Sequence, residues 1–252
     1  MSKIYEALEE AQKEKRGAGL TSAQPASHRF LPVSAPNRDE QGLEKEMLGL
    51  YQSIDSLLPN SLKKVIQFIG SREGEGASTI ACEFGRVTAR KLGKSVLILD
   101  TDCNKPRQHL FFRMAPEFGW EDLLRGYGKG NGDVDKVLYQ VEESSLYICP
   151  ASPSVSITHH VFDSLKIDDL LKKLKERFDL ILVDSAPALA SSDGVAISRN
   201  VDGVVLVLEA ETTRWPVAEN AKVTIEKNGG KILGVVFNKR RYHIPDFIYE
   251  RL

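Results

Sequence analysis

Residues 65–79 read VIQFIGSREGEGAST, an apolar, β-branched run that passes directly into a glycine-rich turn. The run predicts a buried strand, and the spacing of Ile80, Phe84 and Val87 predicts an amphipathic helix after the turn. A strand, a glycine-rich turn and a helix in this order form a nest of backbone N–H groups that binds phosphate. The residues that we expect to bind a nucleotide there are Gly74, Glu75, Gly76, Ala77, Ser78 and Thr79.

The turn departs at two positions from the phosphate-binding consensus GxxxxGK[ST]. Ser71 stands where the consensus has its first glycine, and Ala77 stands where it has the lysine that reaches the phosphates. Ser78 stands where the consensus hydroxyl binds Mg²⁺. A glycine-rich loop without the lysine can also be an ordinary βα connection with no ligand, so other parts of the chain must support the nucleotide site.

Five more apolar runs follow along the chain and alternate with amphipathic segments. They are Val96–Leu99, Leu146–Cys149, Leu180–Val183, Val204–Leu208 and Ile232–Phe237. A helix is also predicted before the first strand, from Leu43 to Leu58, where Pro59 stops it. This alternation predicts a doubly wound, mostly parallel α/β sheet with helices on both faces. Together with the glycine-rich turn, such a sheet resembles the architecture of P-loop NTPases of the Min/Par type. Ligands of such sheets bind at the carboxyl ends of the strands.

Two of the predicted strands end in carboxylates. Asp100 and Asp102 follow the run that ends at Leu99, and Asp184 follows the run that ends at Val183. Carboxylates at this edge of a parallel sheet hold Mg²⁺ and water in phosphoryl-transfer sites. We therefore interpret Asp100, Asp102 and Asp184 as catalytic residues. The expected Mg²⁺ ligands are Ser78, Asp100 and Asp184.

Bulk properties exclude several classes of protein. The 252 residues carry a formal net charge of −1, which gives no electrostatic reason to expect a nucleic-acid partner. The three cysteines are too widely spaced for a disulfide framework or a zinc site. We interpret them as core residues in a reducing compartment, and Trp120 and Trp215 as packing residues.

The chain has three zones by composition. Residues 1–16 predict a short amphipathic helix, residues 17–40 predict a flexible linker, and residues 41–252 form the α/β domain. No apolar run reaches the roughly 20 residues of a membrane span, and the start of the chain is charged rather than signal-like. We expect a cytoplasmic protein that contacts the inner membrane only through a partner.

These motifs resemble those of the bacterial tyrosine kinases of capsule and exopolysaccharide biosynthesis over about residues 42–241. Residues 74–79, GEGAST, are similar to that family's GEGKST, and residues 97–102, LILDTD, resemble its second acidic motif. The segment Phe178–Pro187 resembles its Walker B strand, and Asn238 matches an asparagine that lies near the adenine in relatives. Residues 1–8 resemble an exosortase-linked subgroup.

The resemblance implies a set of ligands and partners. They are ATP or ADP with Mg²⁺, a membrane-embedded protein of polysaccharide chain-length control or export, and further copies of the chain in a homo-oligomer. The departures fall on the residues that make relatives kinases. The phosphate-binding lysine is missing, the ring-forming motif ExxRxxR falls on Glu46, Gly49 and Gln52, and the phosphorylated tyrosine cluster is reduced to Tyr242 and Tyr249.

Three functions remain open from the sequence. The first is a pseudokinase-like regulator that binds nucleotide weakly and acts on polysaccharide assembly through a membrane partner. The second is an active tyrosine autokinase or ATPase in which Arg72, or a residue of a partner, replaces the missing lysine. The third is a positioning ATPase of the Min/Par type, which needs two loop lysines that this chain lacks. We expect the first, because the carboxylates are retained while the lysine and arginines are not.

Overall fold

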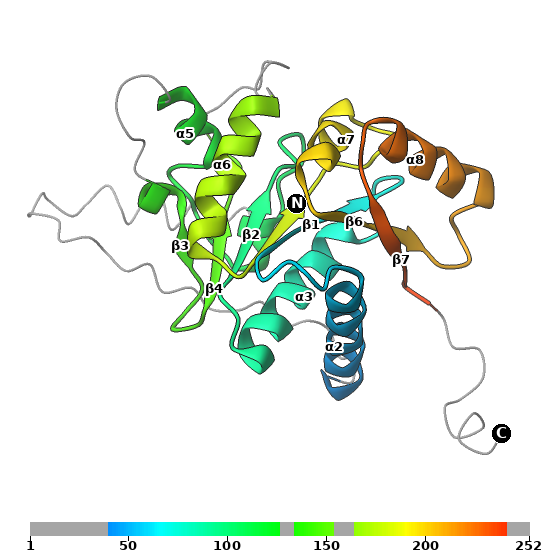
Figure 1. Cartoon of the computed structure of the whole chain (residues 1–252), viewed down its shortest axis with the longest axis horizontal. Helices are drawn as coiled ribbons and strands as arrows, with labels where there is room; N and C mark the ends of the chain where they lie inside the picture. The colour runs from blue at the N-terminus through cyan, green and yellow to red at the C-terminus, as the bar shows by residue number, and fades with distance from the viewer. Residues whose placement is uncertain (1–39, 127–133, 154–163, 241–252) are drawn as a thin grey trace, which may run out of the picture.

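The computed structural model describes residues 40–126, 134–153 and 164–240. These residues form one seven-stranded sheet and the helices that pack on it (Figure 1). The strand order is β3-β4-β2-β5-β1-β6-β7. The strands are β1 (Lys64–Gly70), β2 (Val96–Asp100), β3 (Tyr139–Gln140), β4 (Leu146–Cys149), β5 (Leu180–Asp184), β6 (Gly203–Glu209) and β7 (Ile232–Asn238). All neighbours pair in parallel except the short edge strand β3, which runs antiparallel to β4. The predicted doubly wound, mostly parallel α/β sheet is confirmed.

Helices cover both faces of this sheet. They are α2 (Glu40–Leu57), α3 (Ala77–Leu92), α4 (Gln108–Phe111), α5 (Trp120–Gly126), α6 (Ser164–Arg177), α7 (Ser192–Ile197) and α8 (Trp215–Lys227), with 3-10 turns η1 (Val134–Val137) and η2 (Ser198–Asn200). One apolar cluster joins α2 and α3 to one face, and two clusters join α5, α6, α7 and α8 to the other. The sheet is therefore a central layer with its strand ends free to form a site.

Strand β1 lies in the middle of the sheet, between β5 and β6. All seven of its residues are buried, as expected for a parallel strand covered on both faces. Its side chains alternate, so Ile66 and Phe68 pack toward α3 while Val65 and Ile69 pack toward the opposite layer. Because β1 is held from both sides, the loop that follows it leaves from a rigid position.

Helix α3 lies close to the sheet because of Gly85. A Cβ at that position would lie 3.0 Å from Ile98 and 3.2 Å from Leu182. Helix α2 packs on the outer side of α3, where Tyr51 stacks with Phe84 at a ring-centroid distance of 6.4 Å. The first turn of α3, which carries the glycine-rich loop, is thus fixed by packing on two sides.

The structure also bears on the predictions made for the cysteines and the tryptophans. Cys82 and Cys149 are buried and Cys103 is half-buried, all as free thiols. Trp120 is fully buried, as predicted, but the packing interpretation of Trp215 is wrong: its side chain is 76% exposed, because it begins α8 at the rim of the domain.

The predicted helix at 1–16 and the linker at 17–40 lie outside the described residues, except for Glu40, which begins α2. Tyr242 and Tyr249 also lie outside them. Among the helices that the structure does describe, none has the length and apolar character needed to span a bilayer.

Candidate nucleotide-binding site

The carboxylates at the strand ends meet as predicted. Strands β2 and β5 are neighbours, and Asp100 is the register partner of Asp184. Strand β1 pairs with the other side of β5, so the glycine-rich loop leaves the sheet beside Asp184. Three segments that are distant in sequence therefore converge at one edge of the sheet.

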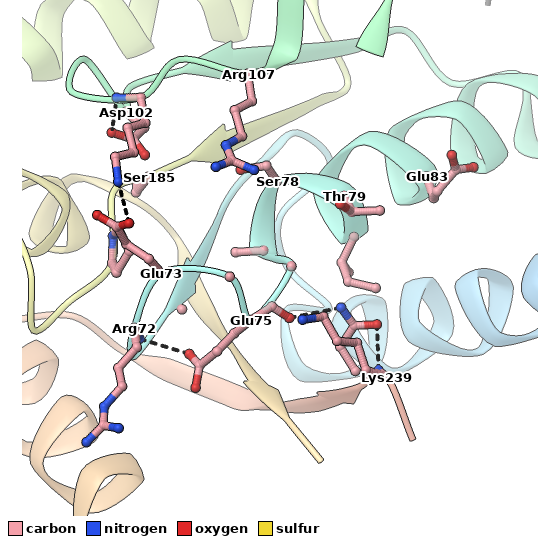
Figure 2. A pocket seen from close by; sticks show the side chains of 18 of the residues that line it. Arg72, Glu73, Glu75, Ser78, Thr79, Glu83, Asp102, Arg107, Ser185 and Lys239 are labelled. Atoms are coloured by element: carbon pink, nitrogen blue, oxygen red, sulfur yellow. Dashed lines mark hydrogen bonds and ion pairs between the residues drawn. The ribbon is translucent and has the colours of Figure 1, made fainter. Parts of the chain in front are cut away.

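A pocket of about 350 Å³ opens at this edge (Figure 2). It is lined by most of the predicted site residues, namely Gly74, Glu75, Gly76, Ala77, Ser78, Thr79, Asp102 and Asn238. Asp100 and Asp184 are 0% and 1% exposed and do not line it. Leu43 of α2 and Phe111 of α4 add apolar wall to the pocket.

The loop has the conformation that its glycines predict. Gly74 and Gly76 have φ angles of 85° and 93°, a region that residues with a Cβ rarely adopt. Gly76 directly precedes the first residue of α3, Ala77. The first N–H groups of a helix have no intrahelical acceptors and face the region in front of it. In this chain that region is the pocket, so the start of α3 can bind an anionic group there.

Glu75 turns its carboxylate into the loop rather than toward the pocket centre. Its Oε2 accepts hydrogen bonds from the N–H groups of Ser71 (2.5 Å) and Arg72 (3.0 Å). Its Oε1 accepts from the hydroxyls of Ser71 (2.8 Å) and Thr213 (2.5 Å). The side chain is 3% exposed, so these bonds replace its hydration. Glu75 therefore fixes the shape of the loop from inside.

Asn238, at the end of β7, holds the loop from the other side. Its side-chain N–H donates to the carbonyl oxygen of Glu75 at 2.9 Å, and its Oδ1 accepts from the N–H of Lys239 at 2.9 Å. Asn238 lines the pocket as predicted, but its amide is committed to the protein backbone. This geometry supports a role in positioning the loop.

Asp100 organises the segment after β2. Its Oδ2 accepts from the N–H groups of Arg107 (3.0 Å) and Gln108 (2.9 Å), and its Oδ1 accepts from that of Asp102 (3.3 Å). Burial and the neighbouring Asp184 charge raise the pKa of Asp100 well above its ordinary value. The carboxylate thus anchors the loop between β2 and α4.

One carboxylate oxygen of Asp184 accepts no hydrogen bond from the described residues. Its Oδ2 accepts from the side-chain N–H of Gln108 at 2.7 Å, while its buried Oδ1 has no hydrogen-bond partner among the residues described. Burial raises the pKa of Asp184 to about 7, although the Gln108 amide and the Ser78 hydroxyl favour its charged form. A partnerless buried carboxylate oxygen is unusual and fits a site for a cation.

The oxygen groups at this edge of the sheet are of the type that binds Mg²⁺. In the described part of the chain, no group of three or more His, Cys, Asp or Glu side chains could hold a metal alone. Mg²⁺ needs no such cage, because it binds through one or two protein oxygens, substrate phosphates and water. The Ser78 hydroxyl and the Asp184 carboxylate are suitable oxygens, whereas Asp100 is already engaged by backbone N–H groups.

Asp102 lies at the rim and shapes the next turn. Its Oδ1 accepts from the N–H groups of Asn104 (3.2 Å) and Lys105 (3.0 Å). The Lys105 ammonium forms an ion pair with Glu73 of the glycine-rich loop. The segment after β2 is thereby attached to the loop after β1 across the mouth of the pocket.

Sequence reasoning missed Gln108. Its buried side-chain N–H groups donate to the Ser78 carbonyl at 3.0 Å and to Asp184 at 2.7 Å, so it joins α3, α4 and β5. No motif marks it, and its one sequence signal is its place at the start of a short helix eight residues after Asp100.

Comparisons with known proteins give relatives that are mostly named tyrosine-protein kinases. CapB of Staphylococcus aureus is 26% identical over 214 residues, which span 82% of this chain and 89% of CapB. The tyrosine-protein kinase CpsD of Streptococcus agalactiae is 26% identical over 70% of this chain and 75% of its own length. The succinoglycan biosynthesis transport protein ExoP of Rhizobium meliloti is 26% identical over 73% of this chain, but only 23% of ExoP is matched. No protein-family profile matches the chain.

Solved structures agree with these relatives. The VpsO kinase domain superposes with a TM-score of 0.68 at 27% identity, over 81% of this chain and 98% of that domain. The cell-division ATPase MinD of Pyrococcus furiosus has a TM-score of 0.57 at 24% identity, over 75% of this chain and 78% of its own, which shows a shared fold. The chain is therefore homologous to the bacterial tyrosine-protein kinases and has the P-loop NTPase fold of their kinase domains.

Proposed function

We propose that this chain is a regulator of capsule or exopolysaccharide assembly that binds ATP or ADP with Mg²⁺ and transfers phosphate poorly. The observation that carries the proposal is the pocket. Its phosphate loop is held in shape by Glu75 and Asn238, it lies beside a partnerless oxygen of Asp184, and it has Ala77 in the lysine position. The kinship with CpsD and ExoP supports the biological process.

Nucleotide binding does not require the missing lysine. The N–H groups at the start of α3 and the positive φ angles of Gly74 and Gly76 are independent of the side chain at position 77. A charge-assisted hydrogen bond contributes about 1.5–3 kcal/mol, so its absence weakens binding roughly 10- to 100-fold. We expect the affinity for nucleotide to fall within the micromolar to sub-millimolar range.

Phosphoryl transfer suffers more than binding. The lysine stabilises the charge that develops in the transition state, and loss of one such donor costs about 10²–10³ in rate. Mg²⁺, when bound, neutralises phosphate charge, and Ser78 with Asp184 would hold it. Asp102, at the rim, is the carboxylate best placed to accept a proton from an incoming hydroxyl. Phosphoryl transfer is therefore expected to be slow, although the Mg²⁺ ligands and the proton acceptor are retained.

A partner in the membrane completes the proposal. ExoP is a transport protein by name, and this chain corresponds to less than a quarter of its length. We infer that this chain acts on the cytoplasmic side by contact with a membrane-embedded protein of polysaccharide chain-length control or export. Association of copies of the chain with one another would bring several such contacts together.

Isothermal titration of ATP and ADP in the presence of Mg²⁺ tests the proposal. The Ala77→Lys variant should bind about tenfold more tightly than the wild type, since it restores one charge-assisted hydrogen bond. Gly49→Lys is the matched control, because Gly49 is exposed on α2 with no heavy atom within 4 Å of an added Cβ. Absence of binding by both wild type and Ala77→Lys would overturn nucleotide regulation. Turnover of ATP by the wild type at kinase rates of about 1–100 s⁻¹ would overturn impaired catalysis.

A further inference from the structure

The pocket retains positive charge although its lysine is absent. The cations that line it are Arg72, Lys105, Arg107 and Lys239. If one of them can reach the phosphates, the charge missing at Ala77 is supplied from elsewhere in the fold. The surroundings of each side chain decide among the four.

Two of the four are already paired, and a third points away. Lys105 forms an ion pair with Glu73, and Lys239 forms one with Glu209 at 3.1 Å. The guanidinium of Arg72 extends from the loop away from Ser78, on the far side of Glu75 (Figure 2). The sequence had suggested Arg72 as the substitute, but its orientation does not favour that role.

Arg107 is exposed, lines the pocket and points toward Ser78 (Figure 2). Its side chain descends from the segment after β2 and its guanidinium ends beside Ser78 (Figure 2). Its positive charge favours the ionised form of Asp184, which is consistent with this position. The structure gives the guanidinium no hydrogen bond or ion pair with any described residue. It is therefore available to an anionic ligand at the start of α3.

The backbone of Arg107 is held in place at both ends. Its N–H donates to Oδ2 of Asp100 at 3.0 Å, and its carbonyl accepts from the N–H groups of Leu110 (3.0 Å) and Phe111 (3.3 Å). A cation on a fixed backbone loses less conformational entropy on binding than one on a free loop. A guanidinium can also bind two phosphate oxygens at once, which an ammonium cannot do in the same planar geometry.

We infer that Arg107 is the phosphate-binding cation of this site and takes the place of the lysine missing at position 77. The inference rests on the proposed nucleotide-binding function and deepens it. It assigns the phosphate contact to the segment between β2 and α4 rather than to the loop after β1. Because its guanidinium lies beside Ser78, Arg107 contacts the phosphates and leaves the nucleoside to other residues.

Titration of ADP, ATP and adenosine into the full chain tests this inference. Arg107→Ala should bind ADP and ATP about 10- to 100-fold more weakly, since it loses a charge-assisted hydrogen bond. Its affinity for adenosine, which carries no phosphate, should be unchanged. Arg72→Ala is the matched control, an arginine that lines the same pocket but points away from Ser78, and it should bind like the wild type.

A second variant guards against indirect effects. In the Ala77→Lys background, Arg107→Ala should lose much less affinity for ADP, because the restored lysine supplies the same charge. The inference is overturned if wild type binds ADP and Arg107→Ala binds it equally well, or if adenosine affinity falls in parallel. It is also overturned if Lys105→Ala alone shows the loss. No binding of any nucleotide by wild type would instead overturn the proposed function, which keeps the two failures distinct.

Discussion

A Cβ atom on Gly76 would lie 2.1 Å from the side-chain nitrogen of Asn238. The two residues are the last of the phosphate loop and the last of β7, so the loop and the far strand meet without space for a methyl group. The amide that blocks this space is the one that donates to the Glu75 carbonyl. Loop conformation and strand position are therefore coupled at this contact.

Gly76→Ala should destabilise the fold and abolish nucleotide binding. The substitution meets Asn238 and also forces a residue with a Cβ to a φ of 93°, a strain of about 1–3 kcal/mol. Chemical denaturation measures the loss. Gly49→Ala is the control, because Gly49 has open space around it in a helix, and it should stabilise by up to about 1 kcal/mol. Equal stability of the two variants would contradict the contact.

Glu75→Gln should loosen the phosphate loop. A glutamine amide keeps one acceptor oxygen for the N–H groups of Ser71 and Arg72, but it has no charge and turns a donor toward the Ser71 and Thr213 hydroxyls, which now donate. Hydrogen bonds to a charged group contribute about 1.5–3 kcal/mol, and we expect a loss of at least that size. Hydrogen exchange at the Ser71 and Arg72 amides should speed up in the variant.

Glu73→Gln provides the comparison for this prediction. Glu73 lies on the same loop, and its exposed ion pair with Lys105 contributes at most about 1 kcal/mol. Its stability and its exchange rates should stay close to those of the wild type. If Glu73→Gln proved the more destabilised of the two, the internal role of Glu75 would be wrong.

Stability should depend on pH through Asp184. Its native pKa is raised to about 7, while an unfolded aspartate titrates near about 4. The native state therefore holds a proton that the unfolded state releases between these values, so the free energy of unfolding falls as pH rises from about 4 to about 7. Asp184→Asn removes the Asp184 part of this dependence, while the raised pKa of Asp100 still contributes, and the variant should be more stable than wild type at pH 8, in chelator, but not at pH 4.

Thermal unfolding at the two pH values measures the effect. Asp168→Asn is the control, since Asp168 is a half-buried surface partner of Lys172 on α6 and should change stability little at either pH. An Asp184→Asn variant that is less stable than wild type at pH 8 would show that the carboxylate is satisfied in the native state. In that case the partnerless Oδ1 would not be a cation ligand.

The oligomeric state should not depend on ATP. The ring-forming motif falls on exposed positions of α2 that carry no arginine, namely Glu46, Gly49 and Gln52. The glycine-rich loop also has no lysine that could contact a γ-phosphate and so make assembly depend on ATP. Light scattering with and without ATP and Mg²⁺ should give the same mass. A nucleotide-dependent dimer would favour the switch mechanism of positioning ATPases instead.

The sequence was sufficient for the fold because the core strands are continuous apolar runs. It also located Asp100 and Asp184 correctly, since a carboxylate that ends a parallel strand must lie at one edge. It did not predict the two-residue strand β3, which is too short to show a pattern. Nor could it show that Glu75 turns inward, because the Thr213 hydroxyl that donates to its carboxylate is 138 residues away.

The sequence also could not predict the direction in which individual side chains point. Arg72 and Arg107 both occur in polar loop segments, and only the fold shows which one faces Ser78. Gln108 was missed for the same reason, because its buried bonds reach residues 30 and 76 positions away. Residues that act through long-range contacts carry no local pattern.

The contact between Asn238 and Glu75 spans 163 residues and has a consequence for biosynthesis. Domains begin to fold while they are still on the ribosome. A nascent chain that has exposed β1 to β6 but not β7 has the glycine-rich turn without the amide that positions it. We expect such a chain to bind the proposed nucleotide more weakly than the complete domain does. Nucleotide binding, as proposed, could therefore assist folding only after β7 has been made, and the earlier stages would rely on the packing of the sheet alone.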